Sequence, residues 1–238
     1  PLAVTLPETV EQLAAVMKFC HAEGIKVVPR GSGTSLSGGA LPLADALLIG
    51  LGKFNRILDI DYANRCVLAQ PGVTNLAITH AVQGKGFYYA PDPSSQIACS
   101  VGGNVAENSG GVHCLKYGLT TNNLLGIEFV TIEGEVLRLG GKHLDSGDYD
   151  LMGVMTGSEG LLGIVSEVTL RILQKPATQR ALLVGFDDTA AAATAVGVVI
   201  GAGIIPAGME MMDGLAINAA EDFVHAGYPR DAAAMIII

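Results

Sequence analysis

The run of residues from Pro91 to Gly118 constrains the fold more than any other stretch of the chain. It contains five glycines, and its only formal charges are Asp92, Glu107 and Lys116. Glycine costs about 1 kcal/mol in a helix interior and also weakens strands, so this composition predicts loops and turns. Glycine pairs let the backbone approach another group closely and let successive N–H groups point the same way. We therefore predict a loop system folded against a large, polar, anionic small molecule, with a mobile surface loop as the alternative. 

Two shorter glycine-rich stretches also adjoin predicted strands. Residues 30–40 follow a strand at 25–29, and residues 157–163 precede a strand that ends near residue 172. A Gly-x-Gly-x-Ser turn after a strand can present N–H groups and hydroxyls to a phosphate, although a plain tight turn is the alternative. The dinucleotide fingerprint and the P-loop are both excluded, because the third glycine and the Gly-Lys-Ser/Thr sequence are missing. Arg30 would be either a charged contact to the phosphate or a solvated surface arginine.

The composition predicts a packed globular protein, because half of the residues are hydrophobic and only 16% are charged. The length of 238 residues allows one large domain or two smaller ones. A net charge of −9 argues against binding nucleic acid or anionic membranes through bulk electrostatics. An anion would therefore be held locally, by backbone amides and a few placed side chains.

Residues 190–209 carry no charge and are long enough to span a membrane, but they are interrupted by four glycines and Pro206. A buried helix followed by a strand at 204–209 explains them better. The four cysteines form no CxxC pair, which predicts reduced thiols in a cytosolic protein. The short, uncharged start of the chain does not resemble a signal peptide.

The spacing of apolar residues predicts a β-α-β opening over residues 4–29 and a second β-α-β-α-β series beyond Pro176. Within the central glycine-rich run, we expect Ile97, Val101 and Val105 to point inward. The sequence finishes inside an apolar strand that begins at Ala232, so we expect a fragment of a longer protein. An open strand edge at residues 236–238 would favour self-association.

The three glycine-rich segments together resemble the FAD-binding PCMH-type flavoproteins of the vanillyl-alcohol oxidase fold. Within them, the chain is most similar to the family of the glycolate oxidase D-subunit and FAD-linked D-lactate dehydrogenase. The motifs that carry the resemblance are Pro29–Gly39, Pro91–Gly118 and Thr156–Val165. The resemblance implies an α+β fold. A two-subdomain PCMH-type FAD-binding domain would cover residues 1–175, and the start of an α/β, ferredoxin-like cap domain would cover residues 176–238.

The resemblance also implies the residues that bind FAD. The loop at 30–38 would cradle the diphosphate, the central run would line the flavin and the ribityl chain, and residues 160–165 would meet the adenine or diphosphate side. FAD would be noncovalent, because Thr34 stands where relatives with covalently attached flavin carry a histidine. The cofactor-binding residues expected on this basis are Pro29, Arg30, Gly31, Ser32, Gly33, Thr34, Ser35, Gly38, Pro91, Asp92, Ser94, Ser95, Gly102, Gly103, Asn104, Asn108, Gly110, Gly111, Tyr117, Gly118, Glu159, Gly160, Gly163, Ile164 and Val165.

The function implied by the resemblance is oxidation of a small D-2-hydroxy acid, glycolate or D-lactate, to the 2-oxo acid, with hydride transfer to the flavin. One alternative is a non-catalytic FAD-binding or structural subunit of a flavoprotein complex. A weaker alternative is a flavin reductase that uses NADPH. Partners would be the hydroxy-acid substrate and further subunits of a glycolate-oxidase-like complex, namely a second flavin subunit and an iron–sulfur subunit. The location would be cytoplasmic, or peripheral at the inner membrane within such a complex.

No catalytic base can be assigned from the sequence. In the family, the histidine-rich segments that bind substrate would lie beyond residue 238, so we expect this chain alone to be inactive. The histidines present have neither paired nor metal-like spacing, and we predict no metal site. They are His21, His80, His113, His143 and His225, and only His113 lies inside one of the three segments.

Overall fold

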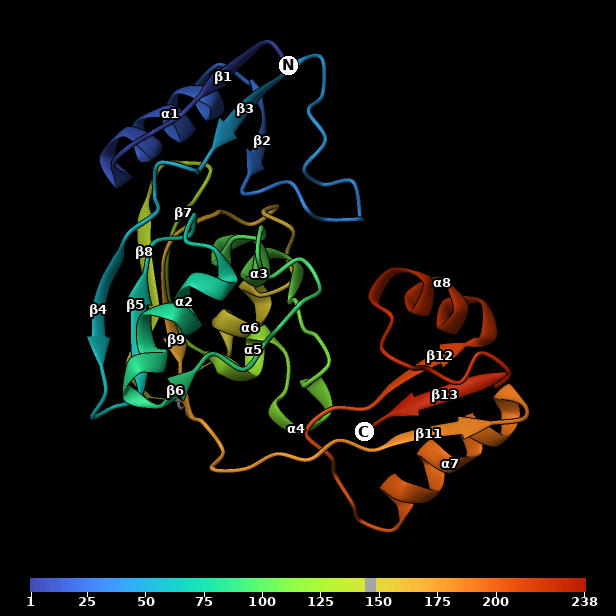
Figure 1. Cartoon of the computed structure of the whole chain (residues 1–238). Helices are drawn as coiled ribbons and strands as arrows, with labels where there is room; N and C mark the ends of the chain where they lie inside the picture. The colour runs from blue at the N-terminus through green and yellow to red at the C-terminus, as the bar shows by residue number, and fades with distance from the viewer. Residues whose placement is uncertain (144–148) are drawn as a thin grey trace. The chain divides into compact units, whose positions relative to one another are not determined.

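The structure, a computed structural model, describes residues 1–143 and 149–238 (Figure 1). These residues form two compact units. The first unit comprises Pro1–Gly111 and Gly118–Lys175, and the second comprises Val112–Tyr117 and Pro176–Ile238. Each unit combines helices with a sheet, which confirms the predicted α+β class.

The first unit opens with a three-stranded parallel sheet in the order β1-β3-β2, which confirms the predicted β-α-β start. Thr9 caps the helix, because its Oγ1 accepts a hydrogen bond from the Gln12 N–H at 3.3 Å. The buried face of the helix carries Leu13 and Met17, which pack against Ile49 of the sheet. The elements are β1 (Ala3–Thr5), α1 (Val10–Ala22), β2 (Lys26–Arg30) and β3 (Ala46–Gly50).

A five-stranded antiparallel sheet in the order β4-β5-β9-β7-β8 forms the larger part of the first unit. Helices α2 and α3 lie over one face of this sheet (Figure 1). A two-stranded ribbon of β6 and β10 lies beside it. The elements are β4 (Ile57–Asp61), β5 (Cys66–Ala69), α2 (Asn75–Val82), the 3-10 turn Gln83–Lys85, β6 (Phe87–Tyr88), α3 (Val101–Glu107), α5 (Thr120–Asn123), β7 (Leu124–Val130), β8 (Val136–Gly140), α6 (Leu151–Met155), β9 (Ile164–Arg171) and β10 (Leu173–Gln174).

The first unit contains two apolar cores. The larger core lies between the five-stranded sheet and helices α2 and α3, where Ile78 and Val101 pack with Val67 of β5. The smaller core surrounds α1 and includes the fully buried Phe54. Val130 and Ile164, from the ends of β7 and β9, belong to the smaller core. The five-stranded sheet therefore contributes residues to both cores.

The sequence predicted loops and turns for residues 91–118, but this run also contains helices. Residues 101–107 form helix α3, and Cys114–Tyr117 form helix α4 of the second unit. Ser100 caps α3 by accepting a hydrogen bond from the Gly103 N–H at 3.3 Å. Val101 and Val105 point inward and are fully buried, as predicted. The prediction for Ile97 is wrong, because its side chain is 76% exposed.

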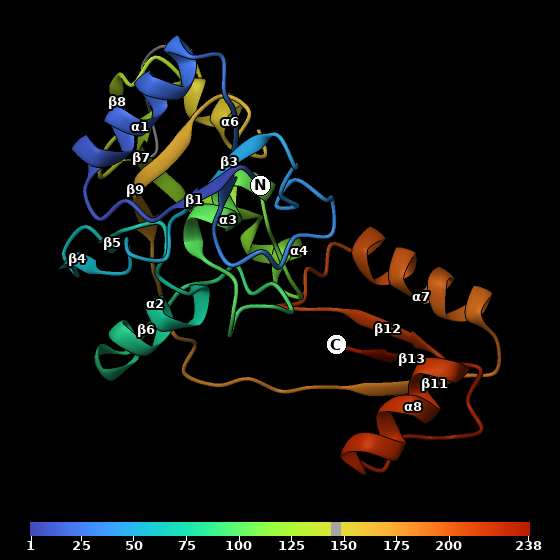
Figure 2. The same cartoon turned by 90° about the horizontal axis from the view of Figure 1, so that it is seen from above.

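The second unit confirms the predicted β-α-β-α-β series. Strand β13 lies between β11 and β12 and is antiparallel to both, while α7 and α8 lie on opposite faces of the sheet (Figures 1 and 2). Ala192 of α7 packs against Ala234 and Ile236 of β13. The elements are β11 (Leu183–Phe186), α7 (Thr189–Gly201), β12 (Glu210–Asp213), α8 (Gly214–Val224) and β13 (Ala234–Ile237).

Two sequence predictions for the second unit are wrong. The strand expected at 204–209 forms at Glu210–Asp213 instead, because Pro206 has no N–H to donate to a sheet. The last strand is not an open edge, since Ile236 pairs with both Val184 and Met211. The uncharged stretch 190–209 includes most of α7, which has 13 residues. Among the described residues, no helix is long and apolar enough to cross a membrane.

Candidate functional site

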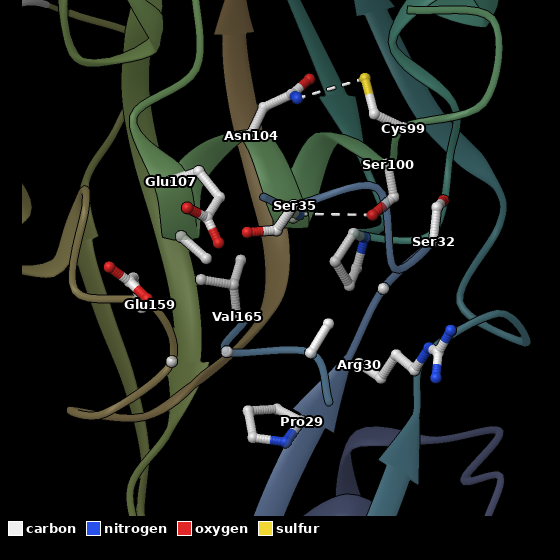
Figure 3. Close-up of a pocket in the computed structure, with 18 of the residues that line it drawn as sticks. Pro29, Arg30, Ser32, Ser35, Cys99, Ser100, Asn104, Glu107, Glu159 and Val165 are labelled. Carbon is white, nitrogen blue, oxygen red and sulfur yellow. Dashed lines mark hydrogen bonds between the residues drawn. The ribbon is translucent and has the colours of Figure 1, made fainter. Parts of the chain in front are cut away.

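A pocket of about 350 Å³ lies in the first unit, where the loop after β2 meets α3 and the segment before β9 (Figure 3). This volume is within the range that proteins use for small molecules and cofactors. All three glycine-rich segments contribute to its wall. The predicted residues that line it are Pro29, Arg30, Gly31, Ser32, Gly33, Thr34, Ser35, Ser95, Gly102, Gly103, Asn104, Glu159, Gly160, Gly163, Ile164 and Val165.

The loop at residues 31–40 carries backbone N–H groups that no other segment satisfies. Across residues 1–143 and 149–238, none of its backbone groups forms a backbone hydrogen bond outside the connection between β2 and β3. Gly33 and Gly38 have φ values of +71° and +89°, a left-handed conformation that glycine adopts without steric cost. A run of free N–H groups in such a loop forms a concave site for an anion.

Helix α3 forms the opposite wall and comes unusually close to this loop. A Cβ atom on Gly31 would collide with the Oγ of Ser100, the cap of α3. A Cβ on Gly102 would lie 3.1 Å from both the Cα and the carbonyl oxygen of Pro71. Gly31 therefore lets the loop approach the side chain of Ser100, and Gly102 lets α3 approach the backbone of Pro71.

Three buried side chains form a hydrogen-bonded network that holds α3 in place. The amide of Asn104 donates from Nδ2 to the Sγ of Cys99 at 3.3 Å (Figure 3), and its Oδ1 accepts from the Nδ2 of Asn75 at 2.9 Å. Asn75 also donates to the carbonyl oxygen of Pro91 at 3.0 Å. Asn104 and Cys99 both line the pocket. This network ties the central run to α2 and so fixes the pocket wall.

The third glycine-rich segment is anchored to the end of α3. The N–H of Gly157 donates to the carbonyl oxygen of Val105 at 2.8 Å, and that of Glu159 donates to Ala106 at 2.9 Å. Gly160 has a φ of +78°, and a Cβ there would lie 2.7 Å from Cγ of Pro29 in β2. This segment therefore joins both walls of the pocket.

Charged side chains in the pocket are few and mostly acidic. Among the described residues that line it, Arg30 is the one cation, whereas Glu107 and Glu159 are carboxylates. Figure 3 shows the two carboxylates on one side of the pocket and Arg30 on the other. An anion bound here depends on backbone N–H groups more than on side-chain charge, as expected for an acidic chain.

The structure does not bring the remaining predicted residues to this pocket. Several of them support its walls instead: Gly111 packs against the backbone of Asp92, and Asn108 ends α3 with a φ of +49°. Tyr117 belongs to the second unit. The predicted residues outside the lining are Gly38, Pro91, Asp92, Ser94, Asn108, Gly110, Gly111, Tyr117 and Gly118.

Thirteen residues that line the pocket are not among the predicted ones, and nine predicted residues lie outside the lining. Some lie between predicted ones within the same segments, and their polar side chains were the available signal. Others, such as Leu51, Pro71 and Met155, are brought in by tertiary packing and carry no local signal. The missed residues are Leu36, Ser37, Gly39, Ala40, Leu51, Pro71, Cys99, Ser100, Ala106, Glu107, Ser109, Met155 and Ser158.

None of the five histidines lines the pocket. Among the described residues, no cluster of three or more His, Cys, Asp or Glu side chains could hold a metal ion. In the part of the chain that the structure describes, no disulfide joins any of the four cysteines, and burial raises the pKa of Cys20 and Cys66. The pocket therefore has the features of a binding site for a polar anionic molecule and contains no histidine base.

Comparison with known families agrees with this geometry. The family described as FAD binding domain matches residues 1–140, and the family described as FAD linked oxidases, C-terminal domain, matches residues 175–238. A solved structure of alkyldihydroxyacetonephosphate synthase superposes with a TM-score of 0.82 at 20% identity, covering 99% of this chain and 46% of that one. This last likeness supports the fold alone.

Curated relatives are similar over much or all of the chain. Glycolate oxidase subunit GlcD of Escherichia coli (strain K12) is 57% identical over 237 residues, covering 100% of this chain and 48% of the relative. GlcD of Bacillus subtilis (strain 168) is 40% identical over 239 residues, with 100% and 51% covered. D-lactate dehydrogenase of Anaerostipes hadrus is 37% identical over 179 residues, with 75% and 38% covered.

The chain thus spans about half the length, or less, of the curated relatives that it matches. The FAD binding domain match alone covers more than half of the chain, and it includes the loop at 31–40 and helix α3. The chain therefore belongs to the FAD binding domain family, and FAD is its cofactor.

Proposed function

We propose that the pocket between the 31–40 loop and α3 binds FAD noncovalently. The observation that carries this proposal is the row of free backbone N–H groups at residues 32–36, which lines a pocket built from all three glycine-rich segments. The pocket-lining members of the predicted set are the proposed FAD ligands. Thr34 offers no nucleophilic ring nitrogen for a covalent link to the flavin. Residues 1–175 are the proposed FAD-binding domain, and residues 176–238 are the proposed N-terminal part of the cap domain.

The diphosphate of FAD is assigned to residues 31–34 of the loop, on the side of Arg30, and not to Ser37 and Gly39, which lie against the carboxylates of Glu107 and Glu159. A phosphate close to either carboxylate would be repelled, whereas the loop amides carry partial positive charge. Gly31, Gly102 and Gly160 leave the pocket walls free of side chains where they approach one another. The residues present therefore fit an extended anionic dinucleotide.

The longer protein is proposed to oxidise a small D-2-hydroxy acid, glycolate or D-lactate, to the 2-oxo acid. The printed names of the GlcD and D-lactate dehydrogenase relatives support this substrate class. Bound FAD would supply the acceptor for the hydride that leaves the α-carbon. The residues of this chain hold and shield the cofactor, and because no histidine lines the pocket, the base that takes the hydroxyl proton is assigned to the rest of the longer protein.

Further subunits are proposed as partners, because the GlcD relatives are named as subunits. On this proposal, a second flavin subunit and an iron–sulfur subunit would accept the electrons. The proposed location is the cytoplasm, with peripheral attachment at the inner membrane within the complex. Copurification of tagged full-length protein with an iron–sulfur subunit would support this arrangement, and a monomer that turns over at full rate would contradict it.

A non-catalytic FAD-binding subunit is the second candidate function. The absence of histidine from the pocket lining favours it, because the pocket holds FAD-type binding features without a histidine base. Turnover of the full-length protein with glycolate or D-lactate and an artificial electron acceptor distinguishes the two candidates. We expect turnover from the full-length protein and negligible turnover from residues 1–238 alone.

The direct test is the visible absorption spectrum of the purified protein, before and after acid denaturation and filtration. We expect flavin bands that pass the filter after denaturation, which means noncovalent FAD. Colour retained by the precipitate would mean a covalent flavin and would overturn the argument from Thr34. A folded, colourless protein that takes up no added FAD would overturn the pocket assignment.

A further inference from the structure

One hydrogen bond connects the 31–40 loop to helix α3 across the pocket. Ser37 donates from its Oγ to Oε2 of Glu107 at 3.3 Å, although 70 positions separate the two residues in sequence. In the described part of the chain, this is the one hydrogen bond from residues 31–40 to any residue beyond the β2–β3 connection. Both residues line the pocket, and neither is among the predicted FAD ligands.

The loop needs such a contact more than most loops do. Four of its ten residues are glycine, which loses more conformational freedom on ordering than any other residue. Within the loop, the Ser37 N–H donates to the Oγ of Ser35 at 3.2 Å, and this local turn directs the Ser37 side chain. A loop that is already ordered loses less entropy when a ligand binds, and the ligand then binds more tightly.

Neither helix stability nor contact with a phosphate explains Glu107. It is the last residue of α3, and a carboxylate is electrostatically unfavourable at the C-terminal end of a helix. A carboxylate also repels the diphosphate that the loop is proposed to bind. The hydrogen bond from Ser37 explains why a hydrogen-bond acceptor is present at position 107.

We propose that Glu107 is a positioning residue that acts through Ser37. Its carboxylate holds the loop in the conformation in which residues 32–36 line the pocket, and so it raises the affinity for FAD. This inference rests on the proposed FAD site. It adds to that site the pair Ser37 and Glu107, whose hydrogen bond holds the loop and does not involve the cofactor.

The test measures two properties of the FAD-free protein and its variants. The first is the dissociation constant for FAD, from quenching of flavin fluorescence. The second is the rate at which thermolysin cuts the FAD-free protein before Leu36, which is fully exposed at the tip of the loop. The variants are Ser37→Ala, Glu107→Ala, the double variant and Glu107→Gln, with the exposed hairpin residue in Glu133→Ala as the matched control.

We expect Ser37→Ala and Glu107→Ala each to raise the dissociation constant about fivefold, the factor expected for one lost hydrogen bond. The double variant should be no weaker than either single variant, because both remove the same contact. Both single variants should be cut faster at Leu36. Glu107→Gln keeps an acceptor oxygen and removes the charge that repels the diphosphate, so it should bind FAD at least as tightly as the wild type and be cut at the wild-type rate. The control should match the wild type in both measurements.

The proposal is overturned if Glu107→Ala binds FAD as tightly as the wild type, or if Glu107→Gln is as weak as Glu107→Ala. If the wild type itself binds no FAD, the proposed function fails, and the cleavage rates alone decide the positioning role. Equal cleavage of Glu107→Ala and wild type would then overturn it, while faster cleavage of Glu107→Ala would support it.

Discussion

The two glycine-rich walls of the pocket use glycine in different ways. In the 31–40 loop, Gly33 and Gly38 adopt left-handed φ values, and the surrounding backbone stays exposed. In α3, Gly102 and Gly103 are helical, and their neighbours Val101 and Val105 are fully buried. One wall therefore depends on conformational freedom and the other on the absence of a side chain.

Because of this difference, we expect loop residues to affect ligand binding and α3 residues to affect folding. The loop contributes few contacts to either core, so changes there should act on cofactor affinity. Helix α3 contributes two residues to the larger core, so changes there should act first on the free energy of unfolding. The same composition thus produces a binding element at one position and a packing element at the other, and substitutions can test the distinction.

The largest expected effect is that of Gly102→Ala. The new methyl would collide with Cβ of Pro71 and lie 3.1 Å from its Cα and carbonyl oxygen, and a proline ring cannot move aside. Overpacking of this kind costs about 1–3 kcal/mol, and here we expect the upper part of that range. Chemical denaturation monitored by circular dichroism measures the loss.

Gly103→Ala is the matched control for this prediction. A Cβ there meets only Ser100 Oγ, at 3.2 Å, and alanine is a better helix former than glycine by about 1 kcal/mol. We expect its free energy of unfolding to equal or exceed that of the wild type. Equal losses in the two variants would mean that glycine in α3 serves backbone conformation after all, and the contrast between the walls would disappear.

The next effect is that of Asn104→Ala, which breaks the buried network behind the same wall. One amide hydrogen of Asn75 would lose its acceptor in a site where Asn75 and Asn104 are 1% and 2% exposed. An unsatisfied buried donor costs about 1–3 kcal/mol, and we expect about 1–2 kcal/mol here. The exposed Asn55→Ala is the control, and a stability equal to wild type in Asn104→Ala would contradict the assigned role.

The elements that the sequence predicted correctly are those with a local signal. Leu13 and Met17 recur at helical spacing, and α1 forms there with Thr9 as its cap. The signal failed for α3, because glycine propensity argued for a loop while burial of Val101 and Val105 favoured a helix. Sheet order also has no local signal, so the central position of β13 could not be predicted.

The presence or absence of a local signal also explains which residues of the candidate site could be predicted. A glycine turn beside a strand has a recognisable composition, which predicted a phosphate loop after residue 30, while the individual residues at 29–35 and 159–165 were expected from the family resemblance. Pro71 lines the pocket because Gly102 packs against it, and Leu51 lines it because β3 ends just before it. Such contacts depend on the whole fold.

The third effect is on binding and tests the loop. In Gly33→Ala, a side chain is forced into a φ of +71°, with its Cβ 2.5 Å from Nη2 of Arg30. A left-handed non-glycine residue costs about 1 kcal/mol, which predicts an FAD dissociation constant about fivefold higher. The free energy of unfolding should fall by no more than this strain of about 1 kcal/mol, because the loop contributes no residue to either core. Gly52→Ala, where no atom lies within 4 Å of the new methyl, is the control. A large loss of stability in Gly33→Ala would mean that the loop is part of the folding core.

The smallest effect lies outside both walls, at Asp61 in strand β4. The pKa of its carboxyl is lowered, first by a hydrogen bond from Nδ2 of Asn64 and then by one from Lys142 at 2.7 Å. A lowered folded-state pKa stabilises the protein above the ordinary value of about 3.9, and this contribution is lost as the pH falls below it. Asp61→Asn should therefore show a shallower fall of melting temperature between pH 5 and pH 3 than the wild type, with unchanged FAD affinity at pH 7. Identical slopes would remove Asp61 from the acid response. A weakened affinity for FAD would mean that the pocket is sensitive to stability lost anywhere in the first unit, and the separation between the binding wall and the packing wall would then not hold.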